Sequence, residues 1–600
     1  MKKITGNKNL LLALIGILTM LPVGNPCCQA GDTSFLPVST VVILDLTKRN
    51  KETGIEVVAL KQCFDITGIS YIITEDLKEA VKYKLIYTAG SLFNATFSPV
   101  ELQTLFAFVE TGGTLVSALI GGNRYYTLFG IDQPVDSRKR YQINFKDSSA
   151  DAALKYIDRK EERSILLGNK NLFPEIIWTH SYEVRDAASL GSTEDGKNVF
   201  SVNEFGEGLA YAFGLAYSDV ILLPHIGGDY EAQRSWINEF EPGSDVFMLI
   251  LKGIFEKTFE TQVYLSAIPY GFQTALLLSH DVDAQSSFRN SIDYALLENR
   301  FGFRSTFFIT TKYFSDETDI GYYNPIRSGY VKNVKELGGD IGSHSVSHSR
   351  TFNKLILGDE NINLAGYRPL SNPTVFGELK VSKEILDKDL PGQDTIVFRA
   401  GELRVPDGLF EALEKSGYKF DSSFSANDNM VNFAYRALKR RNIGAEESSI
   451  VEIPVTFDDS QGFLNESNMD VMVRKWFDVI WANADNEAIS TLLIHPTETG
   501  YKLKTEEKLL SSLQGRDIWI GDIGTYADFW NRRFACRYKA FINRDKLIIR
   551  LLSGAAAPDI SFAVKYPGSI KSVEVQNSNG QRINFLEIKR GDHIFLRNKQ

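Results

Sequence analysis

Two histidines four residues apart, His344 and His348, are the strongest sign of chemistry in this chain. Neutral imidazoles are good ligands for Zn²⁺, and two residues at this spacing lie on one face of a helical turn and can share one metal ion. The 600 residues include only seven histidines. Four of them fall at the ends of predicted strands, namely His280, His344, His348 and His495.

Asp281 and Asp283 follow an apolar run and offer two carboxylates at one strand end. Catalytic metal sites use three protein ligands and keep one position open, so one aspartate can complete the site and the other can act as a base. The zinc proteases with a His-x-x-x-His pair have Glu directly after the first histidine, whereas this chain has Ser345. The base must therefore come from elsewhere. The alternatives are an aspartate that only caps the next helix and a histidine pair that only lies at the surface.

These residues lie in a region, 265–535, that alternates strands with helices. Such alternation is typical of an α/β fold, here a (β/α) barrel, complete or incomplete, in which functional side chains collect at the carboxyl ends of the strands. The predicted strands are 274–279, 303–311, 340–345, 395–399, 450–455 and 490–495, and the predicted helices include 291–299, 331–337, 376–386 and 407–416.

The flanking regions have different patterns. Residues 36–260 alternate buried-strand runs with helices, including a capping box at Ser98 and Glu101, and predict a three-layer α/β domain. Residues 536–600 alternate with period two around the turn pair Asn579-Gly580 and predict a small β-sandwich. The first of these regions loosely resembles a glutamine-amidotransferase-like domain. Cys63 lies in a helical pattern rather than on a nucleophile elbow, so we expect that domain to be non-catalytic.

The region 270–530 resembles the NodB-type polysaccharide deacetylases, a carbohydrate esterase family. The family's motifs occur in the right order: an Asp-Asp motif, a complete His-Ser-x-x-His motif, an Arg motif, an Asp motif and a Leu-x-His motif. The matching residues are Asp281 and Asp283, His344 and His348, Arg399, Asp421, and His495.

Three features depart from the family pattern. Val282 separates the two aspartates, and Pro406 lies farther from Arg399 than the family's proline does, which makes Arg404 an alternative to Arg399. No Asp-Trp pair follows Asp421. His280 is not a family ligand, and we expect it to orient a loop.

The resemblance implies a hydrolase that removes N-acetyl groups from a polysaccharide. Asp283, His344 and His348 would hold Zn²⁺, with Co²⁺ or Ni²⁺ able to substitute. Asp281 would take a proton from water while Arg399 keeps it ionised, and His495 would protonate the departing amine. Asp421 would favour the charged form of His495.

Two other functions remain open. An O-acetyl esterase on the same scaffold would follow the same tetrahedral path, and a non-catalytic glycan-binding surface protein would have lost the metal. The net charge of −9 and the absence of a basic block argue against nucleic-acid binding. The oligomeric state is left open.

The first thirty residues read as an export signal. The uncharged run 10–23 follows a positive start and is shorter than the roughly 20 residues of a spanning helix. Either cleavage before Gly31 or lipidation at Cys27 or Cys28 could follow. We therefore expect an exported protein of a bacterial cell envelope, or a secreted one, with the membrane reached only through an N-terminal lipid. Cys63 and Cys536 could form a bridge, but two buried thiols are favoured.

Overall fold

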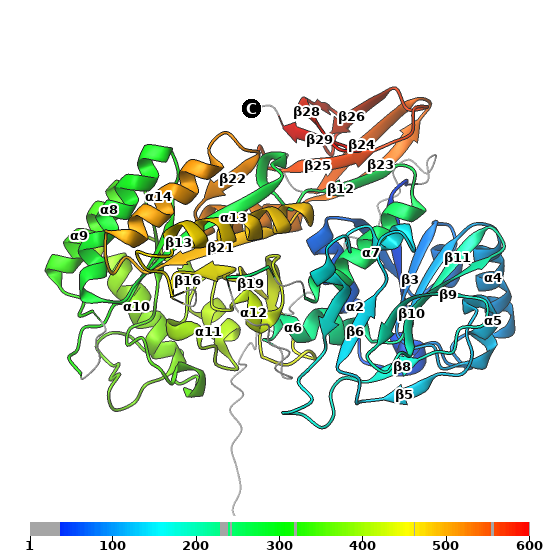
Figure 1. Ribbon diagram of the computed structural model, residues 1–600, viewed down its shortest axis with the longest axis horizontal. Coiled ribbons are helices and arrows are strands. Elements are labelled where there is room, and N and C mark those ends of the chain that lie inside the picture. The colour runs from blue at the N-terminus through cyan, green and yellow to red at the C-terminus, as the bar shows by residue number, and fades with distance from the viewer. Residues whose placement is uncertain are drawn as a thin grey trace, which may run out of the picture. The chain divides into compact units, whose positions relative to one another are not determined.

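The region that carries the candidate residues folds into one curled, mostly parallel sheet with helices between its strands (Figure 1). The computed structural model describes residues 37–227, 238–240, 243–316, 321–460, 463–553 and 557–598. The sheet order is β18-β19-β17-β16-β15-β14-β13-β21-β20, and β22 pairs with β13. The bounds are β13 Thr274–Val282, β14 Thr306–Ile309, β15 Asp340–Ser343, β16 Val397–Phe398, β17 Phe420–Asp421, β18 Tyr435–Leu438, β19 Glu447–Glu452, β20 Phe457–Asp458, β21 Ile489–Ile494 and β22 Ile518–Gly521.

Burial on both faces explains why these strands are apolar throughout. Every residue of β13 is buried, as expected where helices cover a parallel sheet. The segment 447–458 carries both β19, which pairs with β17 near one end of the strand order, and β20, which pairs with β21 at the other end. The helices of this region are α8 Gln285–Phe301, α9 Pro325–Glu336, α10 Val375–Asp389, α11 Leu409–Lys415, α12 Ala426–Asn429, α13 Met469–Asp485, α14 Tyr501–Leu513 and α15 Ile523–Ala535.

The β13 strand runs beyond its predicted end at 279. His280 and Asp281 therefore lie within the strand, and because successive side chains point to opposite faces, they project to opposite sides of the sheet.

The region before this sheet contains a nine-stranded mixed sheet in the order β2-β1-β3-β4-β11-β10-β9-β6-β7. Val41 and Ile43 of β1 share an apolar cluster with the helices α2 and α7, and Val42 and Leu44 share another with α4, so helices cover both faces. The capping box at Ser98 is present. The bounds are β1 Thr40–Asp45, β2 Ser70–Thr74, β3 Leu85–Ala89, β4 Thr114–Ala118, β6 Gln142–Phe145, β7 Ser164–Leu166, β9 Ala188–Thr193, β10 Asn198–Phe205, β11 Gly208–Phe213, α2 Ile55–Thr67, α4 Pro99–Glu110 and α7 Asp245–Thr258.

The C-terminal region forms two four-stranded sheets, β23-β24-β26-β27 and β12-β25-β29-β28. The rings of Tyr538 and Phe562, one from each sheet, are 5.1 Å apart. The strand β12, Gln262–Leu265, precedes the curled sheet in sequence and pairs with β25, so the predicted boundary at 536 leaves out one of these strands. The other bounds are β23 Arg537–Asn543, β24 Lys546–Ser553, β25 Ser561–Lys565, β26 Ser572–Gln576, β27 Arg582–Ile583, β28 Phe585–Arg590 and β29 His593–Asn598.

The three regions share one apolar cluster, and Pro37–Gln600 forms one compact unit. Cys63 and Cys536 are buried free thiols, as favoured from the sequence. Among the described residues, none of the helices combines the length and apolar character needed to span a bilayer. The predicted export signal, with Cys27 and Cys28, lies outside the described residues.

Candidate metal centre

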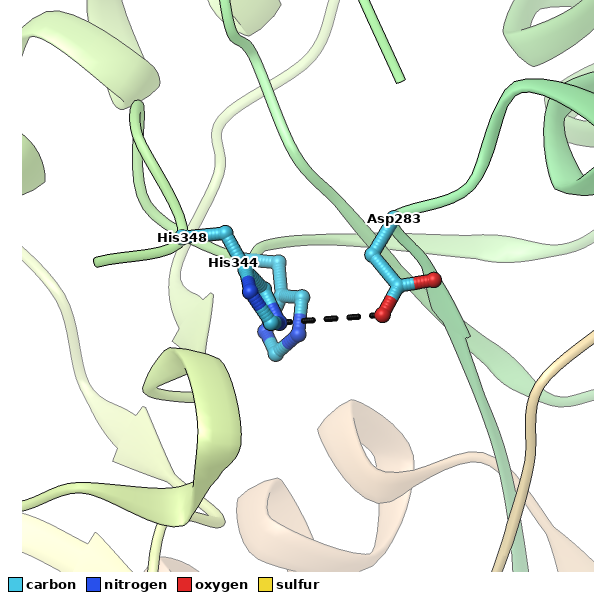
Figure 2. A group of neighbouring side chains, drawn as sticks. All are labelled: Asp283, His344 and His348. Carbon is cyan, nitrogen blue, oxygen red and sulfur yellow. Dashed lines mark ion pairs between the residues drawn. The ribbon is translucent and has the colours of Figure 1, made fainter. Parts of the chain in front are cut away.

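Asp283, His344 and His348 come together at the carboxyl ends of β13 and β15 (Figure 2). One ligand atom from each lies within 4.8 Å of the others. Nε2 of His348 is 3.6 Å from Oδ2 of Asp283. The structure thus brings together the three residues that the family resemblance assigns to the metal.

The turn that presents the two histidines is not helical, and the helical-turn prediction is wrong. Ser345 and His348 have φ of 65° and 50°, in the left-handed region. The buried carboxylate of Glu378 on α10 holds the turn, because Oε2 accepts from the backbone N–H groups of Val346 (2.9 Å) and Ser347 (2.7 Å). A tight turn at the end of β15, rather than a helical turn, therefore brings His344 and His348 together.

The donor set fits a divalent metal ion. Nε2 of His344 is buried and has no hydrogen-bond partner, and the His348 nitrogen beside Asp283 is Nε2. Nδ1 of His344 donates to the carbonyl oxygen of Arg399 at 2.9 Å, which directs Nε2 into the group. Nitrogen and oxygen ligands about 2.1 Å from a tetrahedral metal lie about 3.4 Å apart, close to the 3.6 Å between His348 and Asp283.

The charge states suit the same ligand set. Burial lowers the pKa of both His344 and His348 to about 4, so each is neutral and can bind a metal at neutral pH. Burial raises the pKa of Asp283, so a cation beside it would stabilise its charged form.

Asp281 lies beside the metal ligands but pairs with Arg399. Nη1 of Arg399 donates to Oδ1 of Asp281 at 2.9 Å, and Oδ2 of Asp281 is 3.5 Å from Nε2 of His344. Burial opposes the charge of Asp281, but the Arg399 guanidinium, together with His344 and His495, outweighs it and lowers the pKa of that carboxyl. Asp281 is therefore ionised at neutral pH and available as a base.

Arg399 is fully buried and held at every nitrogen. Nε and Nη2 donate to the backbone oxygen and the hydroxyl of Ser422, at 3.0 and 2.9 Å, and the guanidinium carbon lies 4.2 Å from the centre of the Phe308 ring. The alternative, Arg404, is exposed. The arginine at Asp281 is thus Arg399.

His495, at the end of β21, pairs with Asp459 rather than with Asp421. Nδ1 of His495 is 2.7 Å from Oδ1 of Asp459, and Lys502 forms an ion pair with the same carboxylate. Burial works against the imidazolium, but the Asp459 charge raises the pKa of His495 to about 10. Burial likewise opposes the charge of Asp459, whose pKa falls to about 2 because His495 and Lys502 outweigh it.

Asp421 interacts with Ser423 and Glu452 rather than with His495. It is fully buried at the end of β17 and accepts hydrogen bonds from the backbone (3.2 Å) and hydroxyl (2.7 Å) of Ser423. Its carboxyl interacts with Glu452, and burial raises the pKa of both groups. The expected contact of Asp421 with His495 was wrong because the nearest carboxylate comes from Asp459, which directly follows β20. This strand is too short to be seen in the sequence pattern.

Comparisons with known proteins give a partial likeness. No family model and no curated protein matches the chain. Among solved structures, it is similar to a protein assigned as a polysaccharide deacetylase from Mycobacterium smegmatis, at 18% identity and a TM-score of 0.34, over 43% of this chain and 90% of that chain.

Two further structures belong to the CE4 family. A CE4 pseudoenzyme from Bacillus anthracis matches at 14% identity and a TM-score of 0.27, over 42% of this chain and 65% of that one. The CE4 domain of a multidomain xylanase from the hindgut metagenome of Trinervitermes trinervoides matches at 11% identity and 0.26, over 42% and 90%. At these TM-scores the likeness supports no conclusion about activity. Any function for this chain must be argued from the site residues.

Proposed function

We propose that this protein is an exported, metal-dependent hydrolase that removes N-acetyl groups from a polysaccharide outside the cytoplasm. The observation that supports this most is the meeting of Asp283, His344 and His348, in which Nε2 of His344 is buried without a hydrogen-bond partner and Nε2 of His348 lies 3.6 Å from Asp283. An ionised carboxylate, Asp281, lies beside this group, and a protonated imidazole, His495, contributes to its electrostatics.

The metal ligands and the two proton-transfer groups have separate tasks. A divalent ion, Zn²⁺ in our proposal, would be held by Asp283, His344 and His348, and would polarise the acetamide carbonyl and lower the pKa of water. Asp281 accepts the proton of the attacking water as the new C–O bond forms, and Arg399 keeps that carboxylate ionised before the step.

The carbon–nitrogen bond then breaks, and His495 gives its proton to the leaving nitrogen. The products are acetate and a free amino sugar. Asp459 holds Nδ1 of His495, which leaves Nε2 as the nitrogen that can deliver the proton.

Metal content and acetate release, measured together on the purified protein, test this proposal. We expect about one Zn²⁺ per chain and acetate from at least one member of a panel of N-acetylated glycans, including chitin oligomers and peptidoglycan. The matched control is His348→Ala, which should lose metal and acetate release together. Metal without acetate from any N-acetylated glycan, but with acetate from an O-acetylated one, would replace the deacetylase by an esterase. A chain without metal or acetate release, even with Zn²⁺ or Co²⁺ added, would contradict the proposed hydrolase and favour the glycan-binding alternative.

A further inference from the structure

A second buried group of titratable side chains lies behind the site, on the other side of β13. It consists of His280 on β13, Glu298 on α8 and Glu506 on α14, all at most 1% exposed. One ligand atom from each lies within 4.8 Å of the others. The His280 ring stacks on Phe307 with centroids 4.7 Å apart.

The spacing in this group is that of hydrogen bonds rather than of metal ligands. Nε2 of His280 is 2.8 Å from Oε1 of Glu298, well short of the about 3.4 Å expected between two ligands of one tetrahedral ion. The hydroxyl of Ser305 donates to the other Glu298 oxygen at 2.5 Å. Burial and the charge of Glu298 raise the pKa of Glu506 well above its usual range, so Glu506 is neutral. The group is thus a hydrogen-bonded His280–Glu298 pair beside a protonated acid.

The remaining nitrogen of His280 reaches the strand that carries the proposed acid. Nδ1 donates to the carbonyl oxygen of Ile494 at 3.1 Å. The N–H of the same peptide unit, which belongs to His495, donates to Oδ2 of Asp459 at 3.2 Å. The peptide unit before His495 is therefore held on both sides, by His280 and by Asp459.

We propose that His280 is a positioning residue for His495. It acts through the Ile494 carbonyl, and the hydrogen bond to Glu298 and the stacking on Phe307 hold its ring in place. This inference rests on the proposed function. Because His280 touches neither the metal ligands nor the substrate side of β13, its removal should lower turnover without loss of metal.

Two amide variants separate positioning from a purely structural role. The His280→Asn variant places its amide nitrogen near the position of Nδ1 and keeps a donor toward Ile494, whereas His280→Gln places its amide near the position of Nε2 and keeps the contact with Glu298. We expect His280→Asn to retain kcat within about threefold, and His280→Gln to lose about tenfold in kcat at unchanged KM and metal content. The melting temperature of His280→Gln should be higher than that of His280→Asn, because the Gln side chain keeps a hydrogen-bond partner for the buried Glu298.

A kcat ranking that follows the melting temperatures, with Gln above Asn, would overturn the proposal. So would loss of metal in both variants. If the unaltered protein releases no acetate from any glycan, the proposed function fails, and a second measurement decides the positioning role by itself. This is the solvent exchange of the Nδ1 proton of His495, followed by NMR in protein labelled at histidine. Exchange should be faster in His280→Gln than in His280→Asn; equal rates would refute positioning.

Discussion

At the scale of single residues, surroundings separate the roles of two aspartates that the sequence leaves equivalent. Asp281 and Asp283 are two residues apart, so they project to the same side of the chain. Asp281 receives a hydrogen bond from Arg399, while Asp283 pairs with His348. One carboxylate is therefore held ionised by an arginine, and the other is free to bind the metal.

Replacing the base should separate turnover from metal binding. Asp281→Asn removes the proton acceptor and keeps the shape of the side chain, so we expect kcat to fall by about 10²- to 10⁴-fold with metal content unchanged. Acetate release and metal analysis of the same preparation measure both. Loss of the metal would show that the two aspartates have exchanged roles.

Replacing the partner of His495 should move the alkaline limb of the pH profile. Because the Asp459 charge raises the pKa of His495, Asp459→Asn should lower that pKa, and activity should be lost at a lower pH than in the unaltered protein. The matched control is Asp421→Asn, which removes the carboxylate that does not contact His495. A kcat profile that shifts with Asp421→Asn but not with Asp459→Asn would contradict the pairing described above.

At the scale of elements, helix α10 holds the turn that carries the candidate metal ligands His344 and His348. Glu378 accepts two backbone hydrogen bonds from the turn and a third from Tyr367, whose hydroxyl lies 2.7 Å from Oε1. These contacts compensate the left-handed backbone of Ser345 and His348, which is costly for residues with a side chain. The geometry of the two histidines thus depends on a side chain about thirty residues later in the sequence.

Removing this anchor should weaken metal binding without touching a ligand. Glu378→Ala leaves two N–H groups without an acceptor, and each buried unsatisfied group costs about 1–3 kcal/mol. We expect weaker Zn²⁺ binding in a competition titration and a lower melting temperature. The control is Glu384→Ala, which alters an exposed glutamate of the same helix and should leave the Zn²⁺ affinity unchanged. Equal Zn²⁺ affinity in the two variants would show that the turn keeps its conformation without the Glu378 carboxylate.

At the scale of the whole molecule, the C-terminal sheets are part of the same core as the curled sheet. The hydroxyl of Tyr538 donates to the carbonyl of Val263 at 2.8 Å, and β12 pairs along its whole length with β25. The residues after 535 therefore complete a sheet whose first strand, β12, precedes the curled sheet in sequence.

Deleting residues 536–600 should destabilise the rest of the protein, because these residues do not form an independently folded domain. The deletion takes β25 away from β12 and uncovers apolar side chains of the shared core, including Val263 and Tyr264, which are fully buried. We expect aggregation on expression, or a lower melting temperature than that of the full chain. A soluble fragment with the melting temperature of the full chain would show that the C-terminal strands fold separately.

The charge states of the whole site predict a bell-shaped dependence of activity on pH. As the pH falls, protons compete with the metal for His344 and His348, whose pKa values burial lowers to about 4 in the metal-free site. As the pH rises toward about 10, His495 loses the proton that it must donate. Measurement of kcat/KM with constant Zn²⁺ across this range tests the sign of both limbs. Activity that rises without limit at high pH would exclude His495 as the acid.

The local pattern of the sequence predicted part of the candidate site, and the family resemblance supplied the rest. Spacing singled out His344 and His348, and the apolar run that became β13 predicted that Asp281 would lie at a strand end. Both signals are local, because strand periodicity and ligand spacing depend on neighbours in the chain.

Contacts between distant segments were decided only by the tertiary structure. Asp459 lies beside His495, Glu378 holds the turn at His348, and β12 joins a sheet made of residues some three hundred positions later. Parallel strands align residues that no local spacing relates, and a buried charge takes whichever partner the packing places nearest. The sequence therefore indicated which groups could take part in the proposed chemistry, and the packing of the strands determined the partners that hold those groups.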